Sequence, residues 1–238
     1  MSPDDDRSSP VRATTPAAGR GRDVHAVEGN PAPRLTKRGA ATRARIVHAA
    51  ADLIRTQGVG RTTLDEVIAL SEVSKSQFYR HFEDRSALVL GVIDHIGRET
   101  LEMEREQLSR VHTISGLRQW RDSIVASTSA GPGRHACALG TLVADISPED
   151  VVACRKLDEV FAMWRALFET LLTRLRDHGA ISSEADVTQI AGGFIVAVQG
   201  GCLLARAAGD IEPMASAIDL SIDHLQLLAH VDGMKGLA

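Results

Sequence analysis

Apolar residues recur at intervals of three and four along most of the chain, and no stretch alternates apolar and polar residues as a strand would. This spacing predicts an all-α protein. Ser147 and Pro148 predict the start of one helix, because serine caps a helix and proline suits its first position. The expected helices, about nine in total, cover residues 42–56, 63–70, 75–82, 84–109, 117–128, 136–146, 148–178, 183–208 and 212–230.

The second and third of these helices are short and are joined by a tight break. Thr62 or Thr63 is suited to cap the first, with an acidic residue three positions later to complete a capping box. Ser74 is suited to cap the second. Phe78 and Phe82 are four residues apart and therefore share one face, which we expect to be buried. The pattern predicts a helix-turn-helix.

The opposite face of the second short helix has the chemistry of a nucleic-acid surface. Gln77 offers the donor and acceptor that pair with an adenine edge, and Lys75 suits the acceptors of guanine. Arg80, His81 and the hydroxyl of Tyr79 are donors suited to phosphates. A solvated surface helix is the competing interpretation, but the break, the cap and the aromatic spacing agree with DNA binding.

At these residues the sequence resembles the TetR family of one-component transcriptional regulators. The resemblance rests on Thr62-Thr63, Ile68-Ala69, Val73-Ser74, Phe78-Tyr79-x-His81-Phe82, a basic residue at 85 and Leu88, and it extends from residue 42 to about residue 94. Many relatives have glycine at positions 72 and 76, where this chain has Glu72 and Ser76, and lysine where it has Arg85. The expected DNA contacts are Arg43, Thr62, Thr63, Ser74, Lys75, Ser76, Gln77, Tyr79, Arg80, His81 and Arg85.

Charge is divided along the chain in a way that suits this interpretation. The net charge is -4, yet residues 34–85 carry ten Lys or Arg and six acids, a net charge of +4. Residues 1–33 are rich in proline and lack a periodic apolar pattern. We expect a disordered tail over residues 1–35, a DNA-binding domain over 36–85 and a ligand-binding and dimerisation domain over 86–238.

Five of the eight aromatic residues lie in the second domain. Phe161, Trp164 and Phe168 share a helix face, which suits either a filled core or the wall of a cavity. The resemblance implies that this domain binds a small ligand, which we expect to be apolar or amphipathic. The candidate ligand contacts are His112, Trp120, Cys137, Phe161, Met163, Trp164, Phe168 and Phe194.

The last two helices are candidates for a dimer interface. Residues 183–208 contain several glycines and alanines, which allow another helix to approach closely. Ile218, Ile222, Leu225 and Leu228 form a stripe on the final helix. The resemblance implies a homodimer through these helices, and close packing within one subunit is the alternative.

Several function classes find no support in the sequence. The nine histidines are scattered, and no metal, nucleophile or phosphate-loop motif is recognisable, so we expect neither an enzyme nor a cofactor. Three widely spaced cysteines fit a reducing cytoplasm. No apolar run approaches the roughly 20 residues of a membrane span, and the acidic first residues do not form a signal peptide.

The sequence therefore predicts a cytoplasmic, sequence-specific DNA-binding regulator. Its expected partner is a double-stranded operator, and its expected mechanism is release from that operator by a small molecule. Three alternatives remain open: a constitutive regulator or activator without ligand input, a helical interaction protein that has lost DNA binding, and an enzyme of unrecognised type.

Overall fold

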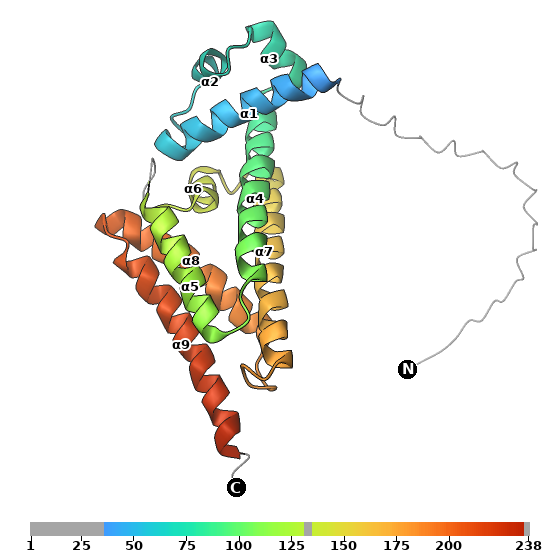
Figure 1. The fold of residues 1–238 in the computed structure, drawn as a ribbon. Helices are drawn as coiled ribbons and strands as arrows, with labels where there is room; N and C mark the ends of the chain where they lie inside the picture. Colours follow the sequence, from blue (N-terminus) through green and yellow to red (C-terminus); the bar gives the residue numbers. More distant parts are fainter. Residues whose placement is uncertain (1–35, 131–134, 236–238) are drawn as a thin grey trace, which may run out of the picture. The chain divides into compact units, whose positions relative to one another are not determined.

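The computed structural model of the chain describes residues 36–130 and 135–235, of which 228–235 are described by their backbone alone (Figure 1). The described residues form nine helices and no strand, which confirms the predicted all-α fold. The expected tail over residues 1–35 lies outside the described residues. The helices are α1 (Lys37–Gln57), α2 (Leu64–Leu70), α3 (Lys75–His81), α4 (Arg85–Ser109), α5 (Ile114–Ser129), α6 (Ala138–Asp145), α7 (Val151–Asp177), α8 (Val187–Ala208) and α9 (Glu212–Lys235).

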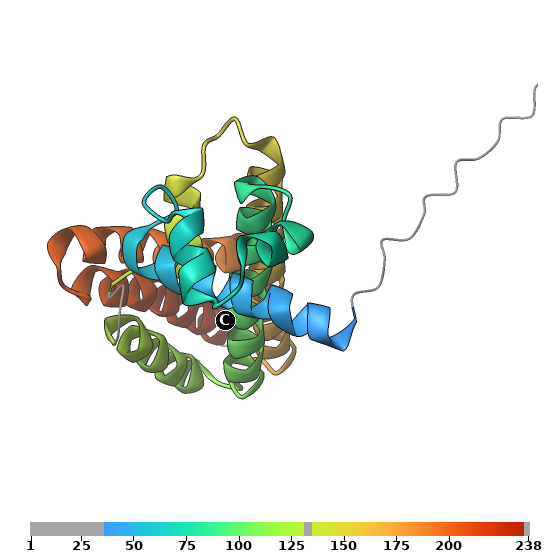
Figure 2. The same cartoon turned by 90° about the horizontal axis from the view of Figure 1, so that it is seen from above.

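Helix α1 packs against α2, α3 and the first part of α4, and Figure 2 views this group from above. Phe78 and Phe82 are buried here, with 0% and 2% of their surface exposed, as their spacing predicts. They belong to the same apolar core as Ile46 and Ala50 of α1 and Val67 of α2. Burial of these side chains fixes the angle between the two short helices.

Local capping signals define the ends of these helices. The Oγ1 atom of Thr63 accepts the backbone N–H of Glu66, whose carboxylate accepts the N–H of Thr63 at 2.8 Å. Ser74 forms the same reciprocal arrangement with Gln77 at the start of α3. Asp84 caps α4 by accepting the N–H of Ala87 at 2.8 Å. The predicted cap at Ser74 is confirmed, and of the two candidates Thr62 and Thr63 it is Thr63 that caps α2.

The remaining helices pack in a chain of neighbours. Helix α4 lies along α7, α7 along α8 and α8 along α9, while α5 lies against α9 (Figure 1). Trp120, Phe168 and Phe194 form an aromatic cluster at their centre, with ring centroids 5.2 Å apart for the first pair and 5.1 Å for the last two. Arg118 holds α5 to α9 through Asp223 at 2.7 Å.

The predicted start of α7 is wrong by three residues. The N–H of Asp150 donates to the carbonyl of Ser147 at 2.9 Å, so residues 147–150 form a turn before the helix. Asp150, rather than Ser147, caps the helix by accepting the N–H of Ala153 at 3.0 Å. The predicted start lies too early because Asp150, a second capping residue, follows Ser147 by three positions.

The small residues of α8 serve two different faces. A Cβ atom placed on Gly201 would lie 2.6 Å from the Cα atom of Met214, so this glycine permits close packing of α8 on α9 within the chain. At Gly201, therefore, the small residue serves close packing within one subunit, the alternative to a dimer contact. Added Cβ atoms on Gly192, Gly193 and Gly200 would meet no described atom within 4 Å.

The apolar stripe of α9 is also turned inward. Ile218, Ile222 and Leu225 are each fully buried among the chain's own helices. The expected interface stripe therefore packs within the chain at these three positions, while Leu220 and Leu227 of α9 remain exposed. The side chain of Leu228 lies outside the described residues.

Candidate nucleic-acid interface and ligand cavity

Helix α3 presents a polar face away from its buried phenylalanine. Lys75, Ser76, Tyr79 and Arg80 are exposed, and 48% of the Tyr79 surface is open to solvent. Helical spacing requires this result, because Phe78 points into the core and its neighbours at one and two positions point elsewhere. The group provides two cations and two hydroxyls on one short helix, which are suitable donors for phosphates and base edges.

Gln77 has a second role that its sequence position did not reveal. Its Oε1 atom accepts the backbone N–H of Ser74 at 2.8 Å, and its own N–H donates to the Oγ of Ser74 at 3.2 Å. The side-chain oxygen is therefore already bound. Because an amide oxygen can accept two hydrogen bonds, Gln77 can keep this cap and still offer its second lone pair and its Nε2 amide group to an adenine.

Arg43 and His81 lie at the junction between α1 and α3. The guanidinium of Arg43 stands over the ring of Phe82, 5.0 Å from its centroid. Burial, together with the charges of Arg80 and Arg43, lowers the pKa of His81 below its usual 6.5. His81 therefore loses its proton at a lower pH than an unperturbed histidine does.

Thr62 and Arg85 are engaged with the protein's own backbone. Thr62 is buried, and its hydroxyl donates to the carbonyl of Gly58 at 2.8 Å. The guanidinium of Arg85 donates to the carbonyl of Thr62 at 2.8 Å and to that of Val59. These contacts tie the connection between α1 and α2 to the start of α4. Thr63 is exposed at the start of α2.

Glu72 occupies a strained backbone position in the turn between α2 and α3. Its φ angle is +53°, in the left-handed region that glycine adopts most easily. The residue is exposed, so its carboxylate adds negative charge close to the polar face of α3.

A cavity of about 300 Å³ lies among the helices that follow the helix-turn-helix. Its wall includes two of the predicted ligand contacts, Cys137 and Trp164, and it also includes Arg55 of α1 and Glu104 of α4. The other lining residues are Thr100, Met103, Ile124, Ser127, Thr128, Ala130, Ala136, Ala138, Thr141, Val198, Cys202 and Met214. We call it the Glu104 cavity.

A second, more apolar cavity of about 460 Å³ lies between α6, α7 and α8. Phe161 and Cys137 line it, as do Val196 and Leu203 from the exposed face of α8. We call it the α8 cavity. The remaining predicted ligand contacts line neither cavity: Trp120, Phe168 and Phe194 fill the aromatic cluster, and His112 and Met163 are exposed.

Glu104 is the one acidic residue among the buried side chains of the described chain. Its Oε2 accepts the indole N–H of Trp120 at 3.0 Å. The indole nitrogen of Trp164 lies near the same carboxyl but makes no hydrogen bond of good geometry. Burial raises the pKa of Glu104 to about 7, although the nearby indole groups oppose the rise.

Sequence reasoning missed Glu104 because it lies in a strongly charged part of α4. The available signal was its spacing. Leu101, Glu104 and Leu108 fall at i, i+3 and i+7 and share the buried face of the helix. An acid on an apolar stripe is rare unless it has a partner or a function.

Two contacts connect these cavities to the DNA-binding end. Asp145, the last residue of α6, accepts the backbone N–H of Val59 at 2.7 Å. Arg55, which lines the Glu104 cavity, donates to Glu99 of α4 at 2.6 Å. Residues of α6 line both cavities, and the last residue of α6 contacts the connection between α1 and α2.

A helix-turn-helix with an exposed basic second helix, carried by a larger helical domain with cavities, defines the class of helix-turn-helix transcriptional regulators. Comparison with known sequences gives the same class. Residues 46–92 match the family model "Bacterial regulatory proteins, tetR family". Residues 113–219 match "Transcriptional regulator LmrA/YxaF-like, C-terminal domain". The chain belongs to the TetR family of DNA-binding transcriptional regulators.

Individual relatives are distant but cover most of the chain. An HTH-type transcriptional regulator in the lacX 3' region of Lactococcus lactis subsp. lactis is 24% identical over 184 residues, covering 75% of this chain and 90% of that protein. The HTH-type transcriptional repressor DhaR of Mycobacterium sp. (strain GP1) is 23% identical over 175 residues, covering 72% and 86%.

Solved structures share the fold at low identity. The TetR family transcriptional regulator CifR, in a structure complexed with 26-base-pair operator DNA, is 15% identical with a TM-score of 0.66, and the match covers 80% of this chain and 97% of that one.

Replacing Glu72 with glycine is expected to raise the free energy of unfolding by about 1 kcal/mol, because glycine adopts a positive φ angle without a Cβ clash. DNA binding should also strengthen, since an acid leaves the interface. Glu72→Gln is the matched control, because it removes the charge and keeps the strain. Urea unfolding and fluorescence anisotropy at fixed salt measure both effects. A less stable Glu72→Gly protein would contradict the strain assignment.

Replacing Glu104 with glutamine is expected to change how stability depends on pH. The native pKa of about 7 lies above the ordinary 4.5, so Glu104 contributes stability below pH 4.5 that is lost as pH rises through 7. The difference corresponds to about 3 kcal/mol. Between pH 5 and pH 8, wild type should therefore lose up to about this much stability relative to Glu104→Gln.

Thermal and urea unfolding at the two pH values measure this difference. Glu102→Gln, an exposed substitution on the same helix, serves as the control and should follow wild type. If wild type and Glu104→Gln showed parallel pH profiles, the carboxyl would not be titrating in the buried site.

Proposed function

We propose that this protein is a homodimeric repressor that leaves its operator when a small molecule occupies the Glu104 cavity. The observation that carries the proposal is the pair of links between the cavity region and the helix-turn-helix: Arg55 in the cavity wall, and Asp145 hydrogen-bonded to Val59. The family supplies the general activity, DNA-binding transcriptional regulation. Repression is suggested by DhaR, which is named a repressor.

The DNA contacts are assigned to the exposed polar face of α3. Lys75, Ser76, Tyr79 and Arg80 are open to solvent there, and Gln77 joins them through its exposed side-chain amide. Arg43 adds charge from α1. Thr63 and Ser74, at the two N-caps, are further expected contacts. Thr62, His81 and Arg85 are also expected contacts, but in the proposal they mainly hold the helix-turn-helix in position.

One recognition helix reads too little sequence to select an operator, so the proposal includes a homodimer on a two-fold site. The exposed apolar residues of the last two helices support this arrangement. Val196, Leu203 and Leu204 of α8 are 71%, 67% and 60% exposed, and Leu220 and Leu227 of α9 are 70% and 68% exposed. Solvent-exposed apolar side chains gathered on neighbouring helices are typical of an interface.

Helix α8 gives a second reason for a partner surface. It is long and apolar enough to cross a membrane by length and composition, with a mean hydropathy of 1.6, yet only 28% of its most apolar window is buried within the chain. A second copy would cover this face, and the open sides of Gly193 and Gly200 leave room for close approach. The proposed location is the cytoplasm, where operator DNA is found.

The Glu104 cavity fits an amphipathic ligand. Its aliphatic and aromatic side chains provide apolar contacts, while the Glu104 carboxyl accepts a hydrogen bond or faces a positive charge. A cation would also favour the ionised form of Glu104 and relieve the burial penalty. To release DNA, such a ligand must prefer the conformation that binds DNA poorly. A ligand with equal affinity for both conformations would not change their populations.

Single substitutions on α3 should weaken operator binding without altering the dimer. Lys75→Ala, Gln77→Ala and Tyr79→Ala are each expected to lower affinity by about tenfold or more, since a good base contact is worth about 1–3 kcal/mol. Arg155→Ala, an exposed cation of α7 distant in sequence from the motif, is the control. Anisotropy on DNA upstream of the gene, with footprinting, measures binding. Unchanged affinity in all three would overturn the interface assignment.

A thermal-shift screen of small amphipathic molecules tests the ligand half of the proposal. Molecules that stabilise wild type should stabilise Glu104→Gln less, and they should release the operator. Normal operator binding with no stabilising molecule would instead favour a constitutive regulator.

Replacing Leu203 with glutamate is expected to convert the dimer into a monomer, because a charge would be buried at the centre of the apolar contact. Light scattering after size-exclusion chromatography measures the mass, and operator affinity should fall with it. Val152→Glu, at a half-exposed valine of α7, is the matched control and should remain dimeric. A dimeric Leu203→Glu protein would place the interface elsewhere.

A further inference from the structure

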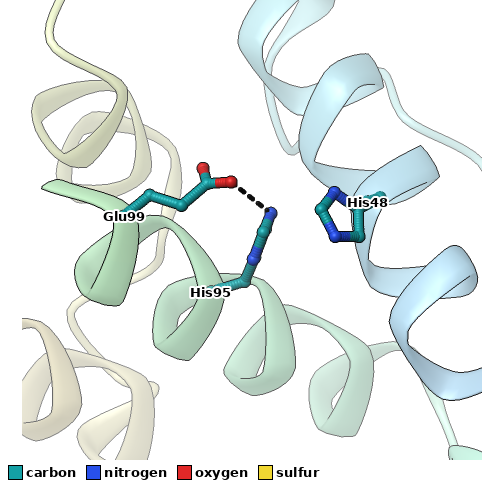
Figure 3. A group of neighbouring side chains, drawn as sticks. All are labelled: His48, His95 and Glu99. Atoms are coloured by element: carbon teal, nitrogen blue, oxygen red, sulfur yellow. Dashed lines mark ion pairs between the residues drawn. The ribbon is translucent and has the colours of Figure 1, made fainter. Parts of the chain in front are cut away.

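Two histidines and one glutamate meet where α1 lies against α4 (Figure 3). His48 of α1 faces His95 of α4, with their ring centroids 4.3 Å apart. Glu99 lies one turn further along α4, and its Oε1 is 3.2 Å from Nε2 of His95. One ligand atom from each of the three residues lies within 4.8 Å of the other two.

We propose that His48, His95 and Glu99 form a binding site for a divalent transition-metal ion such as Zn²⁺, which joins α1 to α4. Two imidazole nitrogens and one carboxylate oxygen are a donor set that suits Zn²⁺ and its first-row neighbours. Water would complete a tetrahedral shell. This site is separate from both cavities, apart from the contact of Glu99 with Arg55, and it does not depend on the proposed ligand mechanism.

The geometry requires only a small adjustment. Atoms bound to one tetrahedral Zn²⁺ lie about 3.4 Å apart, because each is about 2.1 Å from the ion. The three ligand atoms, now within 4.8 Å of one another, must therefore close by up to about 1.4 Å. His48 and Glu99 are exposed, whereas His95 is buried.

His95 has an unsatisfied nitrogen that points to a missing partner. Its Nε2 is buried and makes no hydrogen bond of good geometry, despite its closeness to Glu99.

Arg55 is compatible with this site. Its Nη2 donates to Oε2 of Glu99 at 2.6 Å, and the other oxygen, Oε1, is the one that faces His95. Glu99 can therefore bind the ion through Oε1 and keep Arg55 on Oε2. A carboxylate ligand held by a second hydrogen bond is the usual arrangement around protein-bound metals.

An ion in this position would stabilise the contact between the DNA-binding end and the rest of the protein. Helix α1 packs on α2, α3 and α4, so fixing α1 to α4 fixes the direction in which the recognition helix points. Metal occupancy would then be an input to the regulator distinct from any organic ligand.

Calorimetric titration of the full-length, tag-free protein with ZnCl₂ tests the proposal. Wild type should bind one ion per chain at this site, and its melting temperature should rise with added Zn²⁺. His48→Ala and Glu99→Gln should each weaken binding at least tenfold. His48 is exposed, so its loss leaves the fold intact. His178→Ala, which removes an exposed histidine at the end of α7, should bind as wild type does.

Amide hydrogen exchange gives a second measurement. It separates a bound metal ion from the His95–Glu99 ion pair, which is present without metal. Added Zn²⁺ should slow amide exchange in α1 and α4 of wild type and leave His48→Ala unaffected. The proposal is overturned if wild type binds no Zn²⁺, or if His48→Ala and Glu99→Gln bind it as tightly as wild type does. The latter result would assign the ion to the cysteines or the remaining histidines.

Discussion

The burial of a continuous face of α4, first against α1 and then against α7, is the contact on which the rest of the structure depends. Val92 and Ile93 are fully buried in the first part of α4, and Leu101 and Leu108 continue the buried face further along the helix. Because packed side chains behave as a rigid body, α4 cannot move at one end without moving at the other. The helix therefore connects the helix-turn-helix mechanically to the cavity region.

Directional polar contacts reinforce this packing at the same junction. Arg85 binds the carbonyls of the connection between α1 and α2, Asp145 binds the N–H of Val59 in that connection, and Arg55 binds Glu99. Apolar packing provides most of the stability of the contact between the helix-turn-helix and the helices that follow it. The hydrogen bonds fix the relative position of these two parts. Each hydrogen bond involves a charged group and is worth roughly 1–3 kcal/mol.

The buried carboxyl of Glu104 has a different origin. An acid in an apolar wall reduces stability when it is ionised, and Trp120 offsets only part of this cost. Such a group is retained more readily where a ligand provides the missing partner. This is the same physical situation as the unsatisfied nitrogen of His95, which also lies beside a contact between the DNA-binding end and the remaining helices.

Much of the fold could be predicted from the sequence because its signals are local. The caps at Thr63, Ser74 and Asp84 act over three residues, and the spacing of Phe78 and Phe82 alone shows which face of α3 is buried. Where two capping residues lie close together, as at Ser147 and Asp150, local signals are ambiguous and the predicted helix began too early.

The helices, the helix-turn-helix and the polar face of α3 could be predicted from local residue patterns, since they follow from contacts within one or two helical turns. The burial of Glu104 beside Trp120 and the contact of His48 with His95 depend instead on how the helices pack. The same packing brings Arg55 to both a cavity and Glu99. These pairs are separated by 16 to 47 residues, and helical periodicity carries no information about which helices meet.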